Sequence, residues 1–173
     1  MPTEQIRLLA LDVDGVLTDG SVTYDSAGHE LKSFNIKDGL GLKLLRDAGM
    51  ALAIITGRTS PMVDRRAREL GIDHIIQGRE DKLVALRTLC DQLGLSREQV
   101  AYMGDDLPDL SAIEWSGIGA APADAHVYVR AHADWISTLP GGKGAVRELA
   151  EHLLAREQCL TAVWQRYRLQ QER

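Results

Sequence analysis

The sequence is poor in the residues that mark several classes of protein. It has two cysteines among 173 residues, Cys90 and Cys159, and both lie on predicted helices far apart in the chain. We therefore expect reduced thiols rather than a disulfide, which favours a cytoplasmic protein. The five histidines stand apart from any cysteine or Glu-x-x-His pattern, so a zinc site is not expected.

Long hydrophobic runs and an excess of basic residues are also missing. No segment approaches the roughly 18 consecutive apolar residues of a membrane span. Residues 1–6 show neither the basic start nor the apolar stretch of a signal peptide. The formal net charge of -5, without a basic run, argues against nucleic acid as the main partner. The length and ordinary composition predict one soluble domain, residues 1–173.

Short apolar runs alternate with helical patterns along the chain. Because the runs are continuously apolar, they predict strands that are covered on both faces. Strands alternating with helices predict an α/β fold, a doubly wound parallel sheet of the Rossmann-like kind. The predicted strands are residues 6–11, 50–55, 74–76, 100–103 and 118–121.

Helix boundary signals support this organisation. Ser60 and Pro61 are a cap and a first-turn proline for a helix that ends at Gly71. Leucines at helical spacing predict a second helix over residues 83–93, which Gly94 ends. Residues 20–38 break the pattern and predict a projecting β-hairpin. Residues 144–173 predict a helical tail with a highly charged last part.

Acidic and basic residues follow the predicted strands in an informative order. Asp12 and Asp14 form Asp-x-Asp-Gly after the first strand, and Thr56, Lys82 and Asp105 follow in order. Open α/β sheets keep their active sites at the carboxyl ends of their strands. Such a set suits magnesium-assisted transfer of a phosphoryl group to a carboxylate, because Mg²⁺ takes oxygen ligands from one or two carboxylates and the substrate.

Each residue of this set has a definite expected role. Asp12 is placed as nucleophile and metal ligand, and Asp14 can protonate the leaving oxygen. Asp105 can reach the same metal. Lys82 supplies a fixed positive charge, and Thr56 with nearby backbone amides can hold phosphoryl oxygens.

Each motif also has an ordinary structural interpretation. An Asp-Gly after an apolar run is commonly a turn, a Thr-Gly a loop, and a lysine an exposed helix charge. An EF-hand is excluded because Val16 occupies the fifth position of that loop, its glycine falls too early, and Thr23 replaces the closing glutamate. The order of the motifs at successive strand ends favours one phosphate site over coincidence.

These residues resemble those of the haloacid dehalogenase-like phosphatases. The family's motifs match Asp12-Val-Asp14, Thr56, Lys82 and Gly104-Asp105-Asp106. More specific segments, at residues 15–20, 34–39, 54–58 and 141–148, are similar to the branch that hydrolyses phosphorylated keto-acid sugars of lipopolysaccharide. The resemblance runs from about residue 8 to 151. It implies an aspartyl-phosphate intermediate on Asp12, and Mg²⁺ held by the side chains of Asp12 and Asp105 and the Asp14 carbonyl.

The resemblance also implies where the substrate binds. The expected contacts are Asn35, Ile36, Lys37, Asp38, Gly39, Lys43, Arg58, Arg66 and Lys82. Asn35 and Asp38 can instead cap the following helix, and Arg58 and Arg66 can be surface charges. Pro108 departs from the asparagine of many relatives, and Arg147 is a helix-surface charge unless the tail enters a neighbouring site.

The spacing of the motifs leaves no room for a cap domain. Only the hairpin and one helix fit between Asp14 and Thr56, so one chain leaves its site open to water. Hairpins from several chains can shield a small substrate, and the resemblance implies a homotetramer. The alternative is an enzyme without a cap that acts on a phosphorylated macromolecule.

The expected substrate is a phosphorylated sugar acid with eight carbons. A nine-carbon keto acid 9-phosphate is the close alternative, because related enzymes share the hairpin and motifs. A signalling receiver domain is disfavoured, since receivers place adjacent acidic residues after the first strand. An inactive regulatory partner is disfavoured by the full set of catalytic groups.

Overall fold

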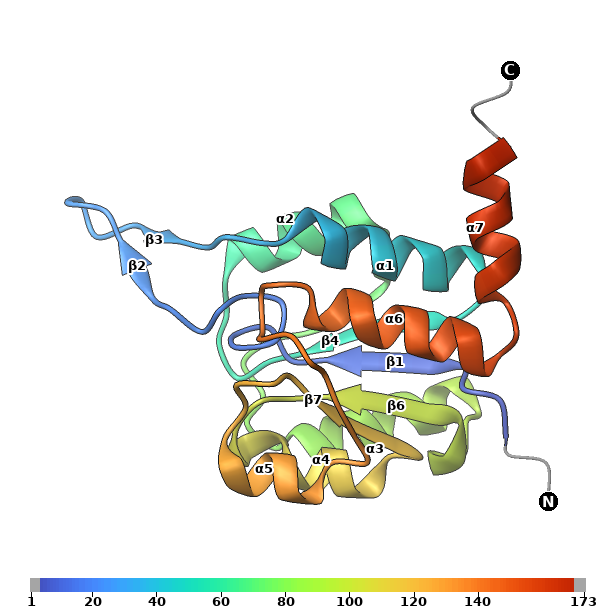
Figure 1. Cartoon of the computed structure of the whole chain (residues 1–173). Helices are drawn as coiled ribbons and strands as arrows, with labels where there is room; N and C mark the ends of the chain where they lie inside the picture. Colours follow the sequence, from blue (N-terminus) through green and yellow to red (C-terminus); the bar gives the residue numbers. More distant parts are fainter. Residues whose placement is uncertain (1–3, 170–173) are drawn as a thin grey trace.

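The computed structural model describes residues 4–169, and its centre is a parallel sheet (Figure 1). The sheet has six strands in the order β5-β4-β1-β6-β7-β8, and every neighbouring pair is parallel. The doubly wound α/β fold expected from the sequence is confirmed. The strands are β1 (Leu8–Leu11), β4 (Ala51–Ile55), β5 (His74–Ile76), β6 (Val100–Met103), β7 (Ile118–Ala121) and β8 (Trp135–Ile136).

Strand β8 was not expected from the sequence. It has two residues at the edge of the sheet, and Ile136 is 44% exposed. A strand this short at the sheet edge does not contain the continuous apolar run from which the other strands were predicted. The first strand also begins later than predicted, because the Ile6 N–H donates to Glu157 Oε1 at 3.2 Å.

Helices cover both faces of the sheet (Figure 1). Leu9 and Leu11 of β1 pack into one core, and Leu8 and Ala10 pack into the other. This alternation follows from the period of two along a strand. The first face carries α1 (Ile36–Asp47), α2 (Pro61–Leu70), α6 (Ala145–Arg156) and α7 (Leu160–Leu169); the second carries α3 (Lys82–Leu93), α4 (Leu110–Trp115) and α5 (Val127–His132).

The predicted helix ends are found in the structure. Ser60 Oγ accepts a hydrogen bond from the Met62 N–H at 3.3 Å, and Pro61 is the first residue of α2. Gly71 and Gly94 end α2 and α3 with φ of 70° and 65°. These are left-handed conformations that glycine adopts without steric cost. In the part of the chain described, no helix is long and apolar enough to cross a membrane.

A hairpin projects from the end of the sheet (Figure 1). Its strands are β2 (Thr23–Tyr24) and β3 (Glu30–Leu31), and they pair antiparallel. The Asp25 carboxylate holds the turn, since it accepts hydrogen bonds from the N–H groups of Ala27 and His29 at 2.8 and 2.9 Å. The segment between the first motif and α1 thus forms the expected hairpin.

The helical tail is divided into two helices. Helix α6 ends at Arg156, and α7 begins at Leu160 and runs in a different direction (Figure 1). Between them Gln158 has a φ of 59°, the left-handed region that stops a helix. Glutamine is an unusual residue there, so the sequence pattern did not signal the break. Residues 170–173 of the predicted tail lie outside the described residues.

Candidate active site

A pocket of about 580 Å³ lies at the carboxyl ends of β1, β4 and β6. The strand order places β1 between β4 and β6, so the residues that follow these three strands meet at one edge of the sheet. The structure therefore brings together all the residues predicted as catalytic or metal-binding. The lining residues are Asp12, Asp14, Gly20, Thr56, Gly57, Arg58, Glu80, Lys82, Asp105, Asp106, Pro108 and Asp109.

The floor of the pocket is a cluster of carboxylates around one lysine. Oxygens of Asp12, Asp105 and Asp109 lie within 4.8 Å of one another. Lys82 Nζ lies 3.0 Å from Asp12 Oδ2 and 2.7 Å from Asp109 Oδ1. Lys82 is the first residue of α3 and its side chain is only 5% exposed. Its charge is therefore directed at the expected nucleophile rather than at solvent.

Asp109 is a residue of the site that we did not predict. Tyr102 Oη donates to Asp109 Oδ1 at 2.7 Å, the same oxygen that Lys82 contacts. The N–H groups of Asp105 and Asp106 donate to Asp109 Oδ2 at 3.1 and 3.3 Å. Its place in the second acidic cluster was the available signal. Tyr102 lies inside an apolar strand, and nothing in the sequence marked its hydroxyl.

Crowding and burial shift the pKa values of this cluster. Burial, followed by the Asp109 charge, raises the pKa of Asp12 to about 6 against the opposing effect of Lys82. Burial, followed by the charge of Asp12, raises the pKa of Asp105 to about 7. Burial alone would lower the pKa of Lys82, but Asp109 and Asp12 raise it. The cluster thus holds more negative charge than one ammonium can balance.

This donor set fits a divalent cation that prefers oxygen ligands. Asp109 is one of the three residues whose carboxylate oxygens lie close together. Both of its oxygens, however, already accept hydrogen bonds from the protein. Asp12 and Asp105 have the oxygens that remain available.

Gly15 lets the first loop approach Asp105, since its φ is 88° and a Cβ there would overlap the Asp105 carboxylate. The glycine of Asp-x-Asp-Gly is thus required for two reasons: the turn needs a positive φ, and a side chain would clash with Asp105.

Asp14 lines the pocket and contacts the base of the hairpin. Lys32 Nζ donates to Asp14 Oδ1 at 2.6 Å. Arg58, which was expected to contact substrate, lines the pocket but donates to Glu30 Oε1 at 2.8 Å. The hairpin base therefore reaches the site of its own chain. The sequence did not predict this contact, because Lys32 belongs to no motif.

The other expected substrate contacts lie outside the pocket of their own chain. Asn35 Oδ1 caps α1 by accepting from the Lys37 N–H at 2.8 Å. Buried Asp38 accepts from the Arg147 N–H at 2.9 Å, near the start of α6. Arg66 donates to the Asn35 carbonyl at 3.5 Å.

The remaining expected contacts belong to the same region. Ile36 and Lys37 are exposed at the start of α1, Gly39 is buried against α2, and Lys43 is half-buried. None of these residues lines the pocket described above.

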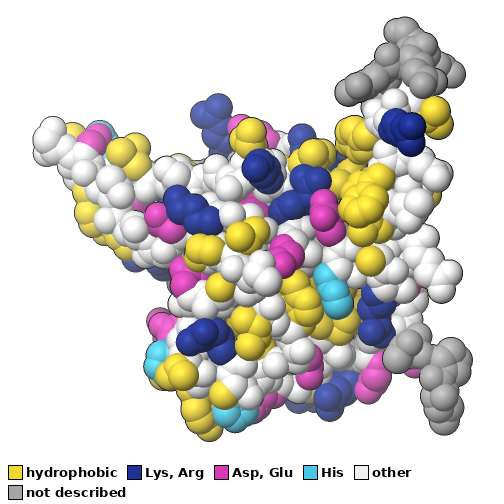
Figure 2. Space-filling model, in the orientation of Figure 1, with side chains coloured by type: hydrophobic (Ala, Val, Ile, Leu, Met, Phe, Trp, Pro, Cys, Tyr) yellow, Lys and Arg dark blue, Asp and Glu magenta, His cyan; other side chains and the backbone are white. Residues whose placement is uncertain are grey.

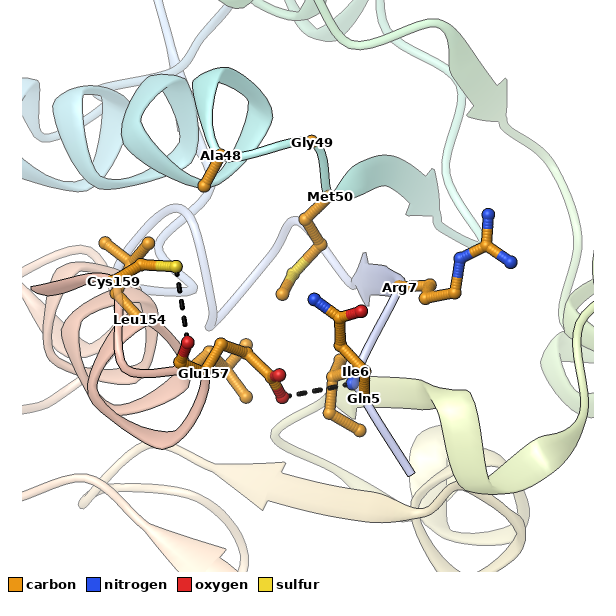
Figure 3. A pocket seen from close by; sticks show the side chains of 10 residues that line it. Gln5, Ile6, Arg7, Ala48, Gly49, Met50, Leu154, Glu157 and Cys159 are labelled. Carbon is orange, nitrogen blue, oxygen red and sulfur yellow. Dashed lines mark hydrogen bonds between the residues drawn. The ribbon is translucent and has the colours of Figure 1, made fainter. Parts of the chain in front are cut away.

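A second, smaller cavity lies at the opposite ends of the strands (Figure 3). Its volume is about 70 Å³, and it is lined by residues before β1 and β4 and by the end of α6. Glu157 and Cys159 border it, with the Cys159 Sγ 3.3 Å from the Glu157 carbonyl oxygen. It lacks the clustered carboxylates of the larger pocket, which is therefore the candidate active site.

Comparison with known proteins supports this assignment. Residues 74–149 match the model of the haloacid dehalogenase-like hydrolases. The chain is similar to the 3-deoxy-D-manno-octulosonate 8-phosphate phosphatase KdsC of Escherichia coli K12, with 46% identity over 87% of this chain and 80% of the relative. The corresponding phosphatase of Haemophilus influenzae is 44% identical over 87% of this chain and 84% of the relative.

Solved structures agree with the sequence relatives. The phosphatase of Moraxella catarrhalis, in complex with a magnesium ion, a phosphate ion and a KDO molecule, has a TM-score of 0.92 and 50% identity. The alignment covers 94% of this chain and 93% of that one. The cobalt-bound form of the Haemophilus influenzae enzyme has a TM-score of 0.84 and 43% identity, over 91% and 90% of the two chains.

Proposed function

The chain belongs to the 3-deoxy-D-manno-octulosonate 8-phosphate phosphatase family of haloacid dehalogenase-like hydrolases, and we propose that it hydrolyses this phosphate ester to the free sugar acid and inorganic phosphate. Membership makes the chain a phosphoric monoester hydrolase and excludes the receiver-domain alternative. The observation that carries the proposal is the single pocket that joins Asp12, Asp14, Lys82 and Asp105.

Asp12 is proposed as the nucleophile. Its carboxylate oxygen attacks phosphorus, the bond from phosphorus to the sugar oxygen breaks, and an aspartyl phosphate forms. Lys82, 3.0 Å from Asp12, faces the charge of the transferring group. Thr56, buried directly after β4, is proposed to hold a phosphoryl oxygen with the adjacent backbone amides.

Asp14 is proposed to move the protons. It gives a proton to the departing sugar oxygen, and as a carboxylate it then takes a proton from the water that attacks the aspartyl phosphate. Water adds to phosphorus, the bond to Asp12 breaks, and phosphate leaves with both carboxyl groups restored. Asp14 lines the same pocket as Asp12, which supports a part for it in both steps.

Mg²⁺ is the proposed cofactor, held by the carboxylates of Asp12 and Asp105 and the Asp14 carbonyl. When bound, it would offset the charge of a dianionic phosphate that otherwise meets several carboxylates. The crowded, partly unbalanced carboxylates of the pocket support this assignment.

We propose that the sugar and its carboxylate are recognised by Asn35 to Gly39, Lys43, Arg58 and Arg66. A guanidinium can bind a carboxylate through two hydrogen bonds. Most of these residues lie outside the pocket of their own chain, so we propose that neighbouring subunits contribute some of them.

A homotetramer is proposed as the working form. The hairpin exposes hydrophobic side chains along its length (Figure 2), with Val22, Tyr24 and Leu31 46%, 61% and 53% exposed. Apolar side chains gathered on a projecting segment favour burial against another chain. The two cysteines are free, which supports the proposed cytoplasmic location.

Release of inorganic phosphate tests the proposal. The purified protein with Mg²⁺ is given 3-deoxy-D-manno-octulosonate 8-phosphate, a nine-carbon keto acid 9-phosphate and glucose 6-phosphate. We expect the highest kcat/KM for the eight-carbon acid and far less for glucose 6-phosphate, which lacks the carboxylate. Equal efficiency on all three, or a preference for the nine-carbon acid, would reject the substrate and leave the phosphatase chemistry.

A further inference from the structure

The hairpin places a buried ammonium group against Asp14. Lys32 Nζ lies 2.6 Å from Asp14 Oδ1 and 3.2 Å from Glu30 Oε1, and the Lys32 side chain is 2% exposed. A lysine that is buried between two carboxylates differs from an ordinary surface charge, because its position is fixed by both partners.

The second oxygen of Asp14 faces another cation. Arg58 Nε lies 3.9 Å from Asp14 Oδ2, and Arg58 Nη2 lies 2.8 Å from Glu30 Oε1. Glu30 therefore contacts both cations that face Asp14. Lys32 comes from the hairpin and Arg58 from the loop after β4, so two separate segments converge on one carboxylate.

We propose that Lys32 is a positioning residue that holds the Asp14 carboxyl group in the orientation required for proton transfer to the sugar oxygen. The inference rests on the proposed function, in which Asp14 is the general acid. Asp14 directly precedes the turn residue Gly15, and its side chain is 22% exposed, so packing alone does not fix its carboxyl group. A catalytic group that is displaced by even about an ångström loses much of its effect.

Glu30 completes the arrangement as a second partner for Lys32. Glu30 contacts Lys32 and Arg58 independently of Asp14, so both cations have a second carboxylate partner that holds them in place beside Asp14. The hairpin base is thereby linked to the proton-transfer step within the same chain, in addition to any contact it makes with a neighbouring subunit.

Two substrates with different leaving groups separate this role from a purely structural one. A sugar oxygen must be protonated to leave, whereas p-nitrophenol leaves as a stable anion without a proton. With Lys32→Met we expect kcat for the sugar acid phosphate to fall at least about tenfold, towards the 10²-fold typical of general acid catalysis. We expect kcat for p-nitrophenyl phosphate to stay within about threefold of the wild-type value.

Four further variants sharpen the test. Lys32→Arg retains the charge and should restore most of the lost activity. His29→Ala, on the same hairpin, replaces a 77% exposed side chain that pairs with Asp25, and it should leave both activities unchanged. Asp14→Asn should show the same dependence on the leaving group, and the double variant with Lys32→Met should be no slower than Asp14→Asn alone.

The outcomes are distinct. An equal fall on both substrates, additive loss in the double variant, or no change in either activity would overturn the role of Lys32. If the wild-type protein releases phosphate from a different alkyl phosphate and not from the sugar acid, the substrate assignment fails. The role of Lys32 is then tested by measuring how Lys32→Met changes kcat for that alkyl phosphate and for p-nitrophenyl phosphate. A fall on the alkyl phosphate alone still supports the role.

Discussion

Lys82 and Asp109 form a buried ion pair beneath the pocket, with Nζ and Oδ1 2.7 Å apart and side chains 5% and 1% exposed. The pair joins the first residue of α3 to the turn after β6. Because Lys82 also lies 3.0 Å from Asp12, Asp109 fixes the ammonium that faces the nucleophile. Tyr102 adds a hydrogen bond to the same Asp109 oxygen.

Asp109→Asn should damage both stability and turnover. The substitution removes one charge of a buried pair, which typically costs about 3–5 kcal/mol in the free energy of unfolding when a charge is left without its partner. Asp12 still pairs with Lys82, so we expect a loss near or below the lower end. Urea unfolding and phosphate release measure the two effects, with exposed Asp91→Asn on α3 as the control. A variant as stable and active as wild type would show that Asp109 does not position Lys82.

Asp105→Asn should stabilise the protein when Mg²⁺ is removed. The folded pKa of Asp105 is about 7, above the ordinary value of 3.8, so the folded state binds more protons than the unfolded state between these values. The metal-free wild-type protein therefore loses stability from this group as the pH rises from about 4 to 7.

The comparison is made in EDTA at pH 5 and pH 8. The amide variant avoids the loss, so at pH 8 we expect it to be more stable than wild type by on the order of 1–3 kcal/mol, with partial exposure limiting the effect. The difference should shrink at pH 5. Asp91→Asn, at an exposed position on α3 outside the carboxylate cluster, controls for general charge effects. A variant less stable than wild type at pH 8 would contradict the crowding of the carboxylates.

Gly15→Ala should disrupt the site directly. The φ of 88° is strained for alanine, and the new Cβ would overlap the Asp105 carboxylate. We expect a destabilisation of about 1–3 kcal/mol and weaker Mg²⁺ binding, because Asp105 must move. Gly28→Ala, with a φ of 84° but no atom within 4 Å of its added Cβ, separates backbone strain from the clash. Calorimetric Mg²⁺ titration that gives equal affinity in both variants would argue against the contact.

Deletion of residues 25–28 should weaken both assembly and activity. The turn that Asp25 holds would be lost, and with it the exposed apolar strands proposed to meet neighbouring chains. Sedimentation velocity should show a tetramer for wild type and smaller species for the deletion. An active wild-type monomer would favour the macromolecular-substrate alternative.

The sheet could be predicted from the sequence because its signals are local. Continuous apolar runs marked five of the six strands, and Ser60 and Gly71 marked the ends of α2. The strand-end positions of Asp12, Thr56 and Asp105 likewise predicted one pocket, since parallel strands bring their carboxyl ends together.

Contacts between distant segments could not be predicted in this way. The Lys32–Asp14 and Arg58–Glu30 pairs depend on how the hairpin folds back, which no local pattern encodes. The role of the Tyr102 hydroxyl could not be predicted because Tyr102 lies within an apolar strand. Its ring packs in the core while its hydroxyl donates to the Asp109 carboxylate.

Turnover by Asp12→Asn tests the central claim most directly. An amide cannot attack phosphorus or hold Mg²⁺ as a carboxylate does, so losing both roles should lower kcat by several orders of magnitude. Phosphate release from 3-deoxy-D-manno-octulosonate 8-phosphate is measured with saturating Mg²⁺, and circular dichroism establishes that the variant is folded. The account predicts phosphate release near the background rate. Substantial turnover by the folded variant would contradict an aspartyl-phosphate mechanism at Asp12.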